Sequence, residues 1–277
     1  MNYYQVSIQS SSADNIEIII AELSQLPFDT FEEDDNIVKA YIPENLFNEE
    51  EIQGILAPYK DVFSLTIDFK LIPYTNWNEV WESNYQPVYI AGKLQIIANF
   101  HTASPDYPLT LLIHPKMSFG TGHHATTSLV AEYLLELDLK NKNILDLGTG
   151  TGILAILARK KGAAEVTATD IDPQCIENAA ENIQLNGAGD IKLLLTNEVP
   201  FQEKGYDIIV GNITRNVILE YLPNIAISLP AKGVFIASGF YKTDLALLEN
   251  NAKANGLELK SNKEKESWCA ALFEKRK

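Results

Sequence analysis

The sequence of 277 residues predicts an α/β fold, in which a small α+β domain precedes a doubly wound, mostly parallel sheet that ends in an antiparallel hairpin. Two observations predict the large sheet. An apolar run at 144–147 leads into a turn with three glycines and then into an Ala-rich helical stretch. Strand-like and helix-like stretches then alternate up to residue 255, and two strand-like runs with no helix between them close the chain.

The first seventy residues predict a domain of their own. Strands are expected at 3–9, 28–33, 37–42 and 62–71, and helices at 15–26 and 43–56. This is the β-α-β-β-α-β order of a ferredoxin-like domain. We place this domain at 1–72, a linker at 73–87 and a second domain at 88–277. Within the linker, Trp77 and Trp81 are four residues apart and would share a helix face.

In the second domain, three short strands are expected before the main sheet, at 88–90, 94–100 and 109–113. The strands of the main sheet are expected at 143–147, 165–169, 191–196, 206–211 and 233–238, with helices at 152–160, 173–186, 217–229 and 242–255. The closing hairpin is expected at 257–260 and 267–273.

Acidic residues are concentrated in the first domain. Residues 1–72 hold fourteen acids and three lysines, a formal charge of −11, whereas the rest of the chain holds nineteen basic and twenty-three acidic residues, a charge of −4. Such a chain is poorly suited to contact nucleic acid through phosphates and better suited to a basic partner. The runs Glu32–Asp35 and Glu49–Glu51 carry much of this charge, although a single run is often only a solvated surface.

Composition argues against a membrane protein, a secreted protein and a zinc protein. No stretch of eighteen apolar residues and no secretory signal is visible, so we expect no membrane partner and a cytoplasmic protein. Cys175 and Cys269 are expected to be buried thiols of a reducing compartment. The chain shows no zinc-ligand spacing of Cys or His, so no metal is expected.

The glycine turn predicts a nucleotide site but allows two ligands. Gly150-x-Gly152-x-x-Ala155, with Asp170 twenty residues after Gly150, fits a dinucleotide fingerprint. Read from Asp146, the same stretch is Asp-x-Gly-x-Gly-x-Gly, the pattern of S-adenosylmethionine-dependent methyltransferases. A carboxylate at the end of the strand suits an ammonium and a sulfonium better than a diphosphate, and so favours the second interpretation.

Polar side chains follow two further strands of the predicted sheet. Asp170 ends the second strand, where it could accept the two hydroxyls of a ribose, while Asp172 could cap the helix that Pro173 begins. Asn212 ends the fourth strand, where its side-chain oxygen could face an amine. The alternative is that Asn212 or Thr214 only caps the next helix.

A Gly-rich loop from Pro115 to Thr127 precedes the main sheet. One interpretation is an ordinary loop, with Thr126 or Thr127 capping the helix that follows. The density of Gly, His and Thr favours a loop that folds over a ligand. Adjacent His123 and His124 are not expected to converge on one metal ion.

These motifs together resemble the PrmA family. The resemblance rests on Phe119-Gly-Thr-Gly-His-His-Ala-Thr-Thr127, the turn from Asp146 to Gly152, Asp170-Ile-Asp-Pro173 and Gly211-Asn212-Ile, and it extends over nearly the whole chain. It implies a class I methyltransferase (Rossmann-like) domain that uses S-adenosyl-L-methionine. It also implies a basic substrate, the large-subunit ribosomal protein eleven at the stalk base, which is methylated on lysine ε-amines and its N-terminal α-amine.

The resemblance implies roles for particular residues. The N-terminal domain of the family docks the substrate, so the acidic N-terminal domain is expected to do so here. The chemistry of the site adds Asn212 and His124 as candidate catalytic residues, because Asn212 could accept a hydrogen bond from the amine and either His124 or water could take its proton. In many members Asn-Ile is followed by Leu-Ala, whereas this chain has Thr214-Arg215 at the acceptor pocket. The residues expected to contact the cofactor are Phe119, Gly120, Thr121, Thr126, Thr127, Asp146, Gly148, Gly150, Asp170, Ile171 and Asn212.

Three other functions remain open at this stage. An NAD-dependent oxidoreductase would need a catalytic His or a Tyr-Lys pair after residue 186, and none is evident. A nucleobase-amine methyltransferase usually has Asn-Pro-Pro-Tyr where this chain has Asn212-Ile-Thr-Arg. A non-catalytic binding module would be expected to lose the glycines or Asp170, which are all present.

Overall fold

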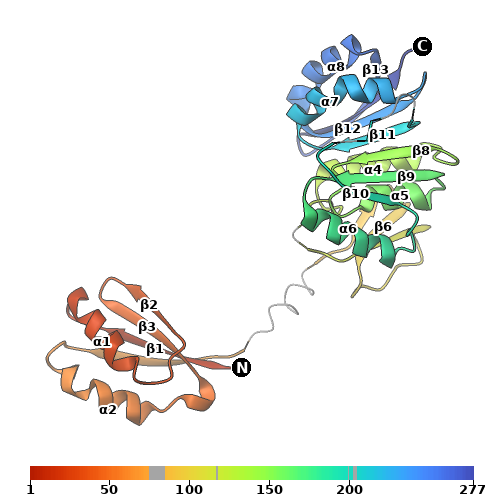
Figure 1. The fold of residues 1–277 in the computed structure, drawn as a ribbon. Helices are drawn as coiled ribbons and strands as arrows, with labels where there is room; N and C mark the ends of the chain where they lie inside the picture. The colour runs from red at the N-terminus through yellow and green to blue at the C-terminus, as the bar shows by residue number, and fades with distance from the viewer. Residues whose placement is uncertain (75–84, 117, 199, 202–204) are drawn as a thin grey trace. The chain divides into compact units, whose positions relative to one another are not determined.

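A computed structural model describes residues 1–74, 85–116, 118–198, 200–201 and 205–277 (Figure 1). The chain divides into two compact units, Met1–Asn84 and Tyr85–Lys277. The expected shared face of Trp77 and Trp81 lies outside the described residues.

The first unit has the predicted β-α-β-β-α-β order. Its antiparallel sheet has the strand order β2-β3-β1-β4, and side chains from both helices and from the strands facing them form one apolar core. The elements are β1 (Tyr3–Gln9), α1 (Ile16–Leu23), β2 (Thr30–Asp34), β3 (Ile37–Pro43), α2 (Glu49–Lys60) and β4 (Thr66–Ile72).

The two largest differences from the predicted boundaries of this unit concern α2 and β4. The single helix expected at 43–56 is a 3-10 turn at Glu44–Leu46 followed by α2, because Phe47 is extended and the Asn48 side chain caps the new helix at the Glu51 amide. The last strand begins at Thr66 and not at Val62, because the Leu65 amide still bonds the Lys60 carbonyl.

The second unit begins with a separate three-stranded sheet, in the order β5-β6-β7, and continues into a seven-stranded sheet. The first part contains β5 (Val88–Ile90), β6 (Leu94–Ala98), β7 (Leu109–Ile113) and α4 (Ala125–Glu136). The second contains β8 (Asn143–Leu147), α5 (Ile153–Lys160), β9 (Glu165–Asp170), α6 (Pro173–Leu185), β10 (Lys192–Leu195), β11 (Ile208–Asn212), α7 (Arg215–Ser228), β12 (Val234–Tyr241), α8 (Leu245–Ala254), β13 (Leu257–Lys265) and β14 (Trp268–Lys275).

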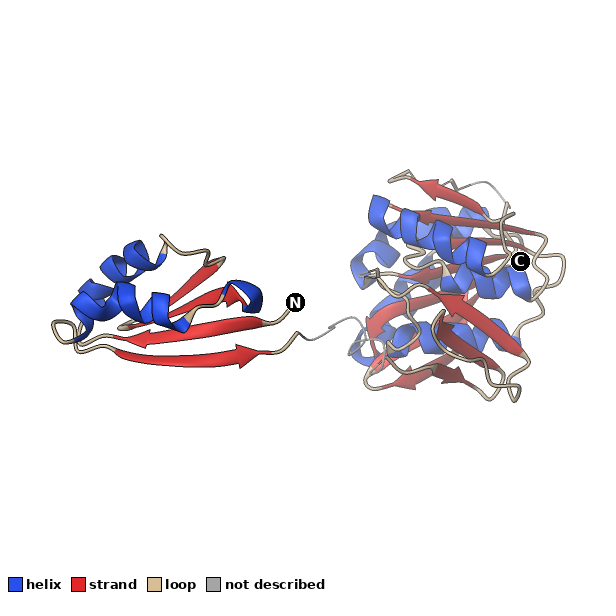
Figure 2. Cartoon of the chain, turned by 90° about the horizontal axis from the view of Figure 1, so that it is seen from below, coloured by secondary structure: helices blue, strands red, loops and turns tan. Residues whose placement is uncertain are grey.

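The seven-stranded sheet has the order β10-β9-β8-β11-β12-β14-β13. Neighbours from β10 to β12 are parallel, and β14 runs antiparallel to β12 and β13, so the predicted closing hairpin is confirmed. Helices pack on both faces (Figure 2): Ile144 of β8 joins the core under α4 and α5, and Leu145 joins the core under α7 and α8. The predicted doubly wound α/β class is therefore confirmed.

The strand order fixes where a ligand can bind. The chain leaves β8 toward β9 and β10 on one side and returns to β11 and β12 on the other side. In open α/β sheets the crevice beyond the carboxyl ends of the strands at such a reversal is the ligand site. Here that crevice lies beyond Leu147, Asp170 and Asn212.

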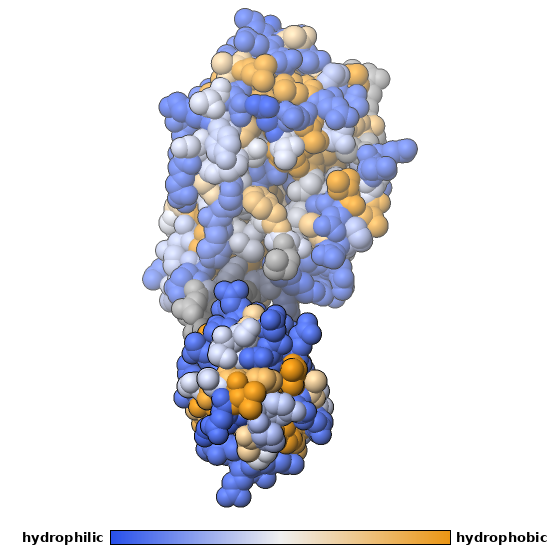
Figure 3. All heavy atoms as spheres, turned by 90° about the vertical axis from the view of Figure 1, so that its left-hand side faces the viewer, coloured by the Kyte–Doolittle hydropathy of each residue, from blue (hydrophilic) through white to orange (hydrophobic). Residues whose placement is uncertain are grey.

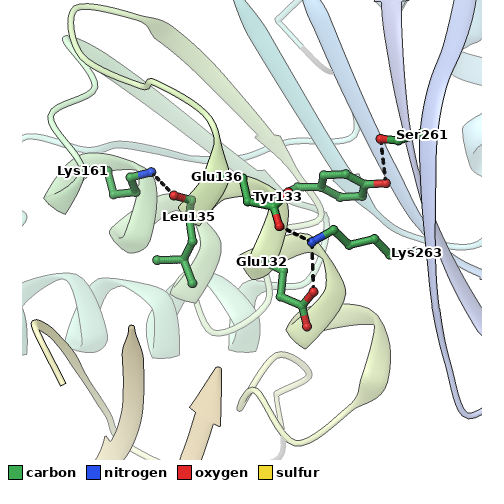
Figure 4. Close-up of polar contacts among 7 residues, drawn as sticks. All are labelled: Glu132, Tyr133, Leu135, Glu136, Lys161, Ser261 and Lys263. Carbon is green, nitrogen blue, oxygen red and sulfur yellow. Dashed lines mark hydrogen bonds and ion pairs between the residues drawn. The ribbon is translucent and has the colours of Figure 1, made fainter. Parts of the chain in front are cut away.

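Helix α4 is held at its far end by two lysines (Figure 4). Lys263 of β13 pairs with Glu132 at 3.0 Å and Glu136 at 2.6 Å, and its ammonium lies 5.0 Å from the centre of the Tyr133 ring. Lys161 donates to three carbonyls at the end of α4, those of Leu134, Leu135 and Leu137, at 2.7–2.8 Å. These contacts fix the helix whose first turn borders the crevice.

Within the part of the chain that the structure describes, no helix has both the length and the apolar character to cross a membrane.

Candidate functional site

A cleft of about 610 Å³ opens at the carboxyl edge of the seven-stranded sheet. Its walls come from the loop before α4, from the ends of β8, β9, β10 and β11, from α6 and α7, and from the hairpin. The lining residues are Phe119, His124, Thr126, Leu147, Gly148, Gly150, Thr169, Asp170, Ile171, Cys175, Thr196, Asn212, Ile213, Thr214, Val217, Tyr221, Gly239 and Trp268.

The glycine turn after β8 forms the floor of the cleft. Gly148 and Gly150 have φ values of 67° and 55°, which only glycine adopts without strain. A Cβ on Gly148 would lie 2.4 Å from the Ile213 Cγ2 atom, and one on Gly150 would lie 2.2 Å from the Phe119 carbonyl oxygen. Glycine at these positions therefore makes room for Ile213 and for the Phe119 carbonyl, and both glycines line the cleft with backbone alone.

Asp146 is not among the residues that line the cleft, and the contact of its carboxylate with the cationic end of a ligand stays a prediction. It shares a face of β8 with buried Ile144 and is 1% exposed, because strand side chains alternate and Leu147 takes the position at the cleft. Its Oδ2 accepts a hydrogen bond of 2.6 Å from the Thr149 hydroxyl. Burial raises the pKa of the Asp146 carboxyl to about 6, and the Thr149 bond opposes this shift.

Asp170 lies at the end of β9 and lines the cleft. Its Oδ2 accepts from the Gly150 amide at 2.9 Å and its Oδ1 from the Asp172 amide at 3.0 Å. Each oxygen keeps a second lone pair, so the carboxylate can still accept two hydroxyls. Asp172 caps α6 at the Gln174 amide, as predicted, and its neighbour Ile171 lines the cleft with a 74% exposed side chain.

Among its described residues, the loop before α4 lines the cleft with two side chains, half-exposed Phe119 and the cap residue His124. Gly120 is not part of the lining, and its carbonyl accepts from the Thr151 hydroxyl at 2.7 Å. Thr121 also lies outside the lining, because its hydroxyl pairs with the His123 ring at 3.1 Å. The expected contacts of Gly120 and Thr121 with the cofactor are therefore not supported by the geometry.

His124, and neither Thr126 nor Thr127, caps α4. The His124 Nδ1 accepts from the Thr126 amide at 3.3 Å and lies 2.8 Å from the Thr126 hydroxyl. An imidazole whose Nδ1 accepts from an amide carries its hydrogen on Nε2 when neutral. The ring contacts Phe119 and Trp268, with centroids 5.0 and 4.8 Å away, so His124 forms part of an aromatic wall.

Thr126 and Thr127 are fully buried in the first turn of α4, and only Thr126 lines the cleft. The Thr127 hydroxyl lies behind Asn212 and accepts from the Asn212 Nδ2 at 3.3 Å. The direct contact of Thr127 with the cofactor stays a prediction, and the contact that the structure shows is with Asn212.

Asn212 ends β11 and presents the most distinctive polar atom of the site. With its Nδ2 donated to Thr127, its Oδ1 is buried and has no hydrogen-bond donor. A buried acceptor without a partner is costly unless a ligand supplies the hydrogen. Thr214 occupies the cap position of α7 without a capping bond, so Asn212 is not explained as a helix cap.

Sequence reasoning missed several lining residues, among them Trp268, Tyr221, Thr196 and Cys175. Thr196 follows β10 at the same edge as Asp170, so the strand-end rule could have found it. Trp268 starts β14 and stacks on Tyr241 at 4.2 Å, a position set by the hairpin and carrying no sequence signal. Cys175 was expected to be buried like Cys269, but it is only partly buried.

Arg215, which departs from the common family pattern, does not project a free charge into the cleft. Its Nη1 pairs with the Asp244 carboxylate at 2.7 Å, and its Nε and Nη2 contact the Asn216 side chain. Among the residues with described positions, no group of three side chains could hold a metal ion.

Comparisons with known proteins agree on one family. The family model described as "Ribosomal protein L11 methyltransferase (PrmA)" matches residues 4–276. The ribosomal protein L11 methyltransferase of Porphyromonas gingivalis is 40% identical over 260 residues, 93% of this chain and 90% of that protein. The protein of the same name from Phocaeicola vulgatus is 37% identical over 279 residues, 99% of each chain.

Solved structures extend the likeness to the fold. The ribosomal protein L11 methylase of Lactobacillus delbrueckii subsp. bulgaricus has a TM-score of 0.64 at 28% identity, over 70% of this chain and 99% of that chain. A methyltransferase from Pyrococcus furiosus has a TM-score of 0.51 at 20% identity, over 60% of this chain and 90% of that chain. The second likeness shows the fold alone.

Proposed function

The chain belongs to the PrmA family, the ribosomal protein L11 methyltransferases, and from this premise we propose that it transfers methyl groups from S-adenosylmethionine to amines of ribosomal protein L11. The amines are lysine ε-amines and the N-terminal α-amine. The observation that carries the proposal is the buried Asn212 Oδ1, an acceptor without a donor at the wall of the cleft. An amine N–H is the partner that this atom lacks.

The residues of the cleft fit the methyl donor. The bare backbone at Gly148 and Gly150 leaves room for a ligand in direct contact, and Asp170 offers two acceptors to the ribose hydroxyls. Ile171, Thr196 and Cys175 offer a mostly apolar wall to a planar base. When bound, S-adenosylmethionine supplies a methyl group on a sulfonium, which an amine can attack without further activation of the donor.

The protein's own residues then act mainly by orientation. A lysine amine must be neutral to attack, and its pKa is about 10.4 in water. Transfer into a largely apolar cleft disfavours the ammonium form. Asn212 Oδ1 accepts one N–H and thereby aims the nitrogen lone pair, while Thr127 holds the Asn212 amide in place.

His124 lines the cleft and is a candidate acceptor for the proton that the amine loses. The Nδ1 of His124 is occupied by the Thr126 amide, and its neutral form carries hydrogen on Nε2. Taking up a proton at Nδ1 would break the cap of α4. We therefore propose that His124 forms the wall of the acceptor side together with Trp268, and that the proton leaves to water.

The N-terminal domain is proposed to dock the substrate. Its net charge of −11 complements a basic ribosomal protein of the stalk base. On the face of this unit seen in Figure 3, hydrophilic side chains surround a central apolar patch. We also propose that the substrate-docking domain covers residues 1–72, the linker residues 73–87 and the methyltransferase domain residues 88–277. We further propose that the reaction takes place in the cytoplasm, because its substrate is a ribosomal protein, and that it needs no direct contact with nucleic acid.

Two measurements test the function. Calorimetric titration with S-adenosylmethionine and, separately, with NAD should give saturable binding of the first alone. Intact-mass analysis of ribosomal protein L11 after incubation with enzyme and donor should show additions of one CH₂ per transfer. Binding of NAD alone would overturn the methyltransferase assignment, and donor binding without any mass change in L11 would overturn the substrate.

A further inference from the structure

Two fully buried polar residues, Thr151 and Asn182, lie behind the cleft and do not line it. We propose that they are positioning residues, which lock the loop carrying Phe119 to the glycine turn, so that both walls of the donor site form one rigid body before the donor arrives. This inference rests on the proposed function for its catalytic consequence, although the lock itself is a property of the free protein.

Thr151 uses all three of its polar groups in this lock. Its amide donates to the Phe119 carbonyl at 2.9 Å, and its hydroxyl donates to the Gly120 carbonyl at 2.7 Å. Its own carbonyl accepts from the Asn182 side chain at 2.8 Å. The residue between Gly150 and Gly152 therefore joins the loop on one side and α6 on the other.

Asn182 closes the second half of the lock. Its Nδ2 donates to the Thr151 carbonyl, and its Oδ1 accepts from the His114 amide at 2.7 Å. Asn178, one turn earlier on α6, donates to the His114 carbonyl at 3.1 Å. The loop is thus fixed where it leaves β7, at His114, and again at Phe119 and Gly120.

The packing leaves no room for the two segments to slide. A Cβ on Gly150 would lie 2.2 Å from the Phe119 carbonyl oxygen, and one on Gly120 would lie 2.8 Å from the Thr151 hydroxyl. Glycine at both positions therefore lets the backbones of the loop and of the turn pack in van der Waals contact. The base of the loop is already packed against the glycine turn in the free protein.

The same helix supplies a matched control. Asn186 lies one turn after Asn182 and bonds backbone in the same way, with its side chain accepting from the Leu112 amide at 3.0 Å and donating to the Leu112 carbonyl at 2.6 Å. The Asn186 side chain also donates to the Asn182 carbonyl of the same helix at 2.8 Å, and none of these three bonds reaches the loop or the glycine turn. A purely structural role would make Asn182 and Asn186 equivalent in every functional measurement.

The variants Thr151→Val, Thr151→Ser, Asn182→Ala and Asn186→Ala test the lock. Valine keeps the shape and the amide of Thr151 but removes the hydroxyl. In the free protein, hydrogen exchange at residues 118–122 and at position 151 should be faster in Thr151→Val and Asn182→Ala. It should be unchanged at these positions in Thr151→Ser and Asn186→Ala.

The functional readout is donor affinity against turnover. Thr151→Val and Asn182→Ala should weaken the Kd for S-adenosylmethionine about tenfold, as expected for one lost positioning bond, with kcat at saturating donor changed much less. Thr151→Ser should restore the wild-type Kd, and Asn186→Ala should lower Tm while leaving the Kd unchanged.

Two results would overturn the proposal. One is unchanged exchange at 118–122 in Thr151→Val, which would show that the loop does not depend on the lock. The other is a loss of affinity that tracks Tm equally in Asn182→Ala and Asn186→Ala, which would show a structural role only. If the wild type binds no donor, the proposed function fails, but the exchange measurement still decides whether the lock exists.

Discussion

The amide nitrogen of Asn212 donates to the hydroxyl of Thr127 over 3.3 Å, and this bond turns the Asn212 carbonyl oxygen into a buried acceptor with no donor of its own. The two residues come from different elements, the end of β11 and the first turn of α4. Their hydrogen bond therefore cannot be predicted from their positions in the sequence. It nevertheless fixes the orientation of the Asn212 side-chain amide in the cleft.

Replacing Asn212 tests its assigned role. Asn212→Ala should lower kcat by roughly 100-fold, the usual cost of removing one hydrogen bond made in the transition state, with a much smaller change in donor Kd. Single-turnover kinetics and calorimetry separate the two quantities. Thr127→Val should also lower kcat, but by a smaller factor. Unchanged turnover in Asn212→Ala would remove Asn212 from the mechanism.

Asp170 is expected to act on binding and not on chemistry. Asp170→Ala removes the acceptor of the Gly150 amide and of the proposed ribose hydroxyls. Because hydrogen bonds to a charged group are strong, donor Kd should rise by about 10- to 100-fold. Calorimetry checks this, with Asp172→Ala as the control that removes only the cap of α6. A donor Kd that moves equally in both variants would contradict the assignment.

Asp146 should make the stability of the second domain depend on pH. Its pKa of about 6 in the folded state lies above the ordinary carboxyl pKa of 3.8, so the folded state holds the proton more tightly between these values. The free energy of unfolding should therefore fall as pH rises from 4 to 7, by up to about 3 kcal/mol from this group.

Asp146→Asn checks this prediction, because the amide keeps the size of the side chain and an acceptor for Thr149 but does not titrate. The stability difference between variant and wild type, from denaturant unfolding, should shift in favour of the variant between pH 4 and pH 7. Parallel pH curves would mean that the buried carboxyl does not titrate in this range.

Gly239 should not tolerate a side chain. It has a φ of 92° in β12, and a Cβ there would lie 2.1 Å from the Ile213 carbonyl oxygen, just after Asn212. Gly239→Ala should destabilise the domain by about 2 kcal/mol or more. Thermal unfolding measures this, with Gly189→Ala as control, because no atom lies within 4 Å of a Cβ at that site. Similar Tm values for the two variants would refute the close approach.

The acidic charge of the first domain should affect substrate capture alone. The double change Glu33→Gln with Asp35→Asn should raise the KM for ribosomal protein L11 about two- to fivefold at low salt, and the effect should shrink as ionic strength rises. Donor Kd should stay constant. Glu249→Gln with Glu266→Gln removes two exposed charges from the second domain as a matched control. Equal KM values for both pairs would argue against electrostatic docking.

The strand-end rule predicted a large part of the site. Parallel strands bring their carboxyl ends to one edge, so Asp170, Asn212 and the glycine turn converge although they are far apart in the sequence. The rule does not say which face of the sheet a side chain takes, and one step along β8 places Asp146 outside the cleft lining. The strand-end rule does not predict that Trp268 lines the cleft, because the position of Trp268 depends on how β14 pairs with β13 and β12.

Helix ends show a second limit. Ser, Thr, Asn and Asp are the usual caps, so Thr126 and Thr127 were reasonable predictions. The observed cap is His124, which frees Thr127 to hold Asn212. Local residue preferences predict where α4 begins but not which of several polar residues caps it. That choice depends on contacts with β11, which lies about eighty residues later in the chain.

An enzyme that methylates amines could also methylate its own lysines, and Lys161 is a candidate because its pKa is lowered. Burial lowers its pKa, so its neutral amine is more accessible. Its three N–H groups, however, satisfy the Leu134, Leu135 and Leu137 carbonyls that end α4. A methyl group there would leave one of these carbonyls without its donor, so the helix end protects this lysine from self-modification, and it should stay unmodified in the mass spectrum of enzyme stored with its donor.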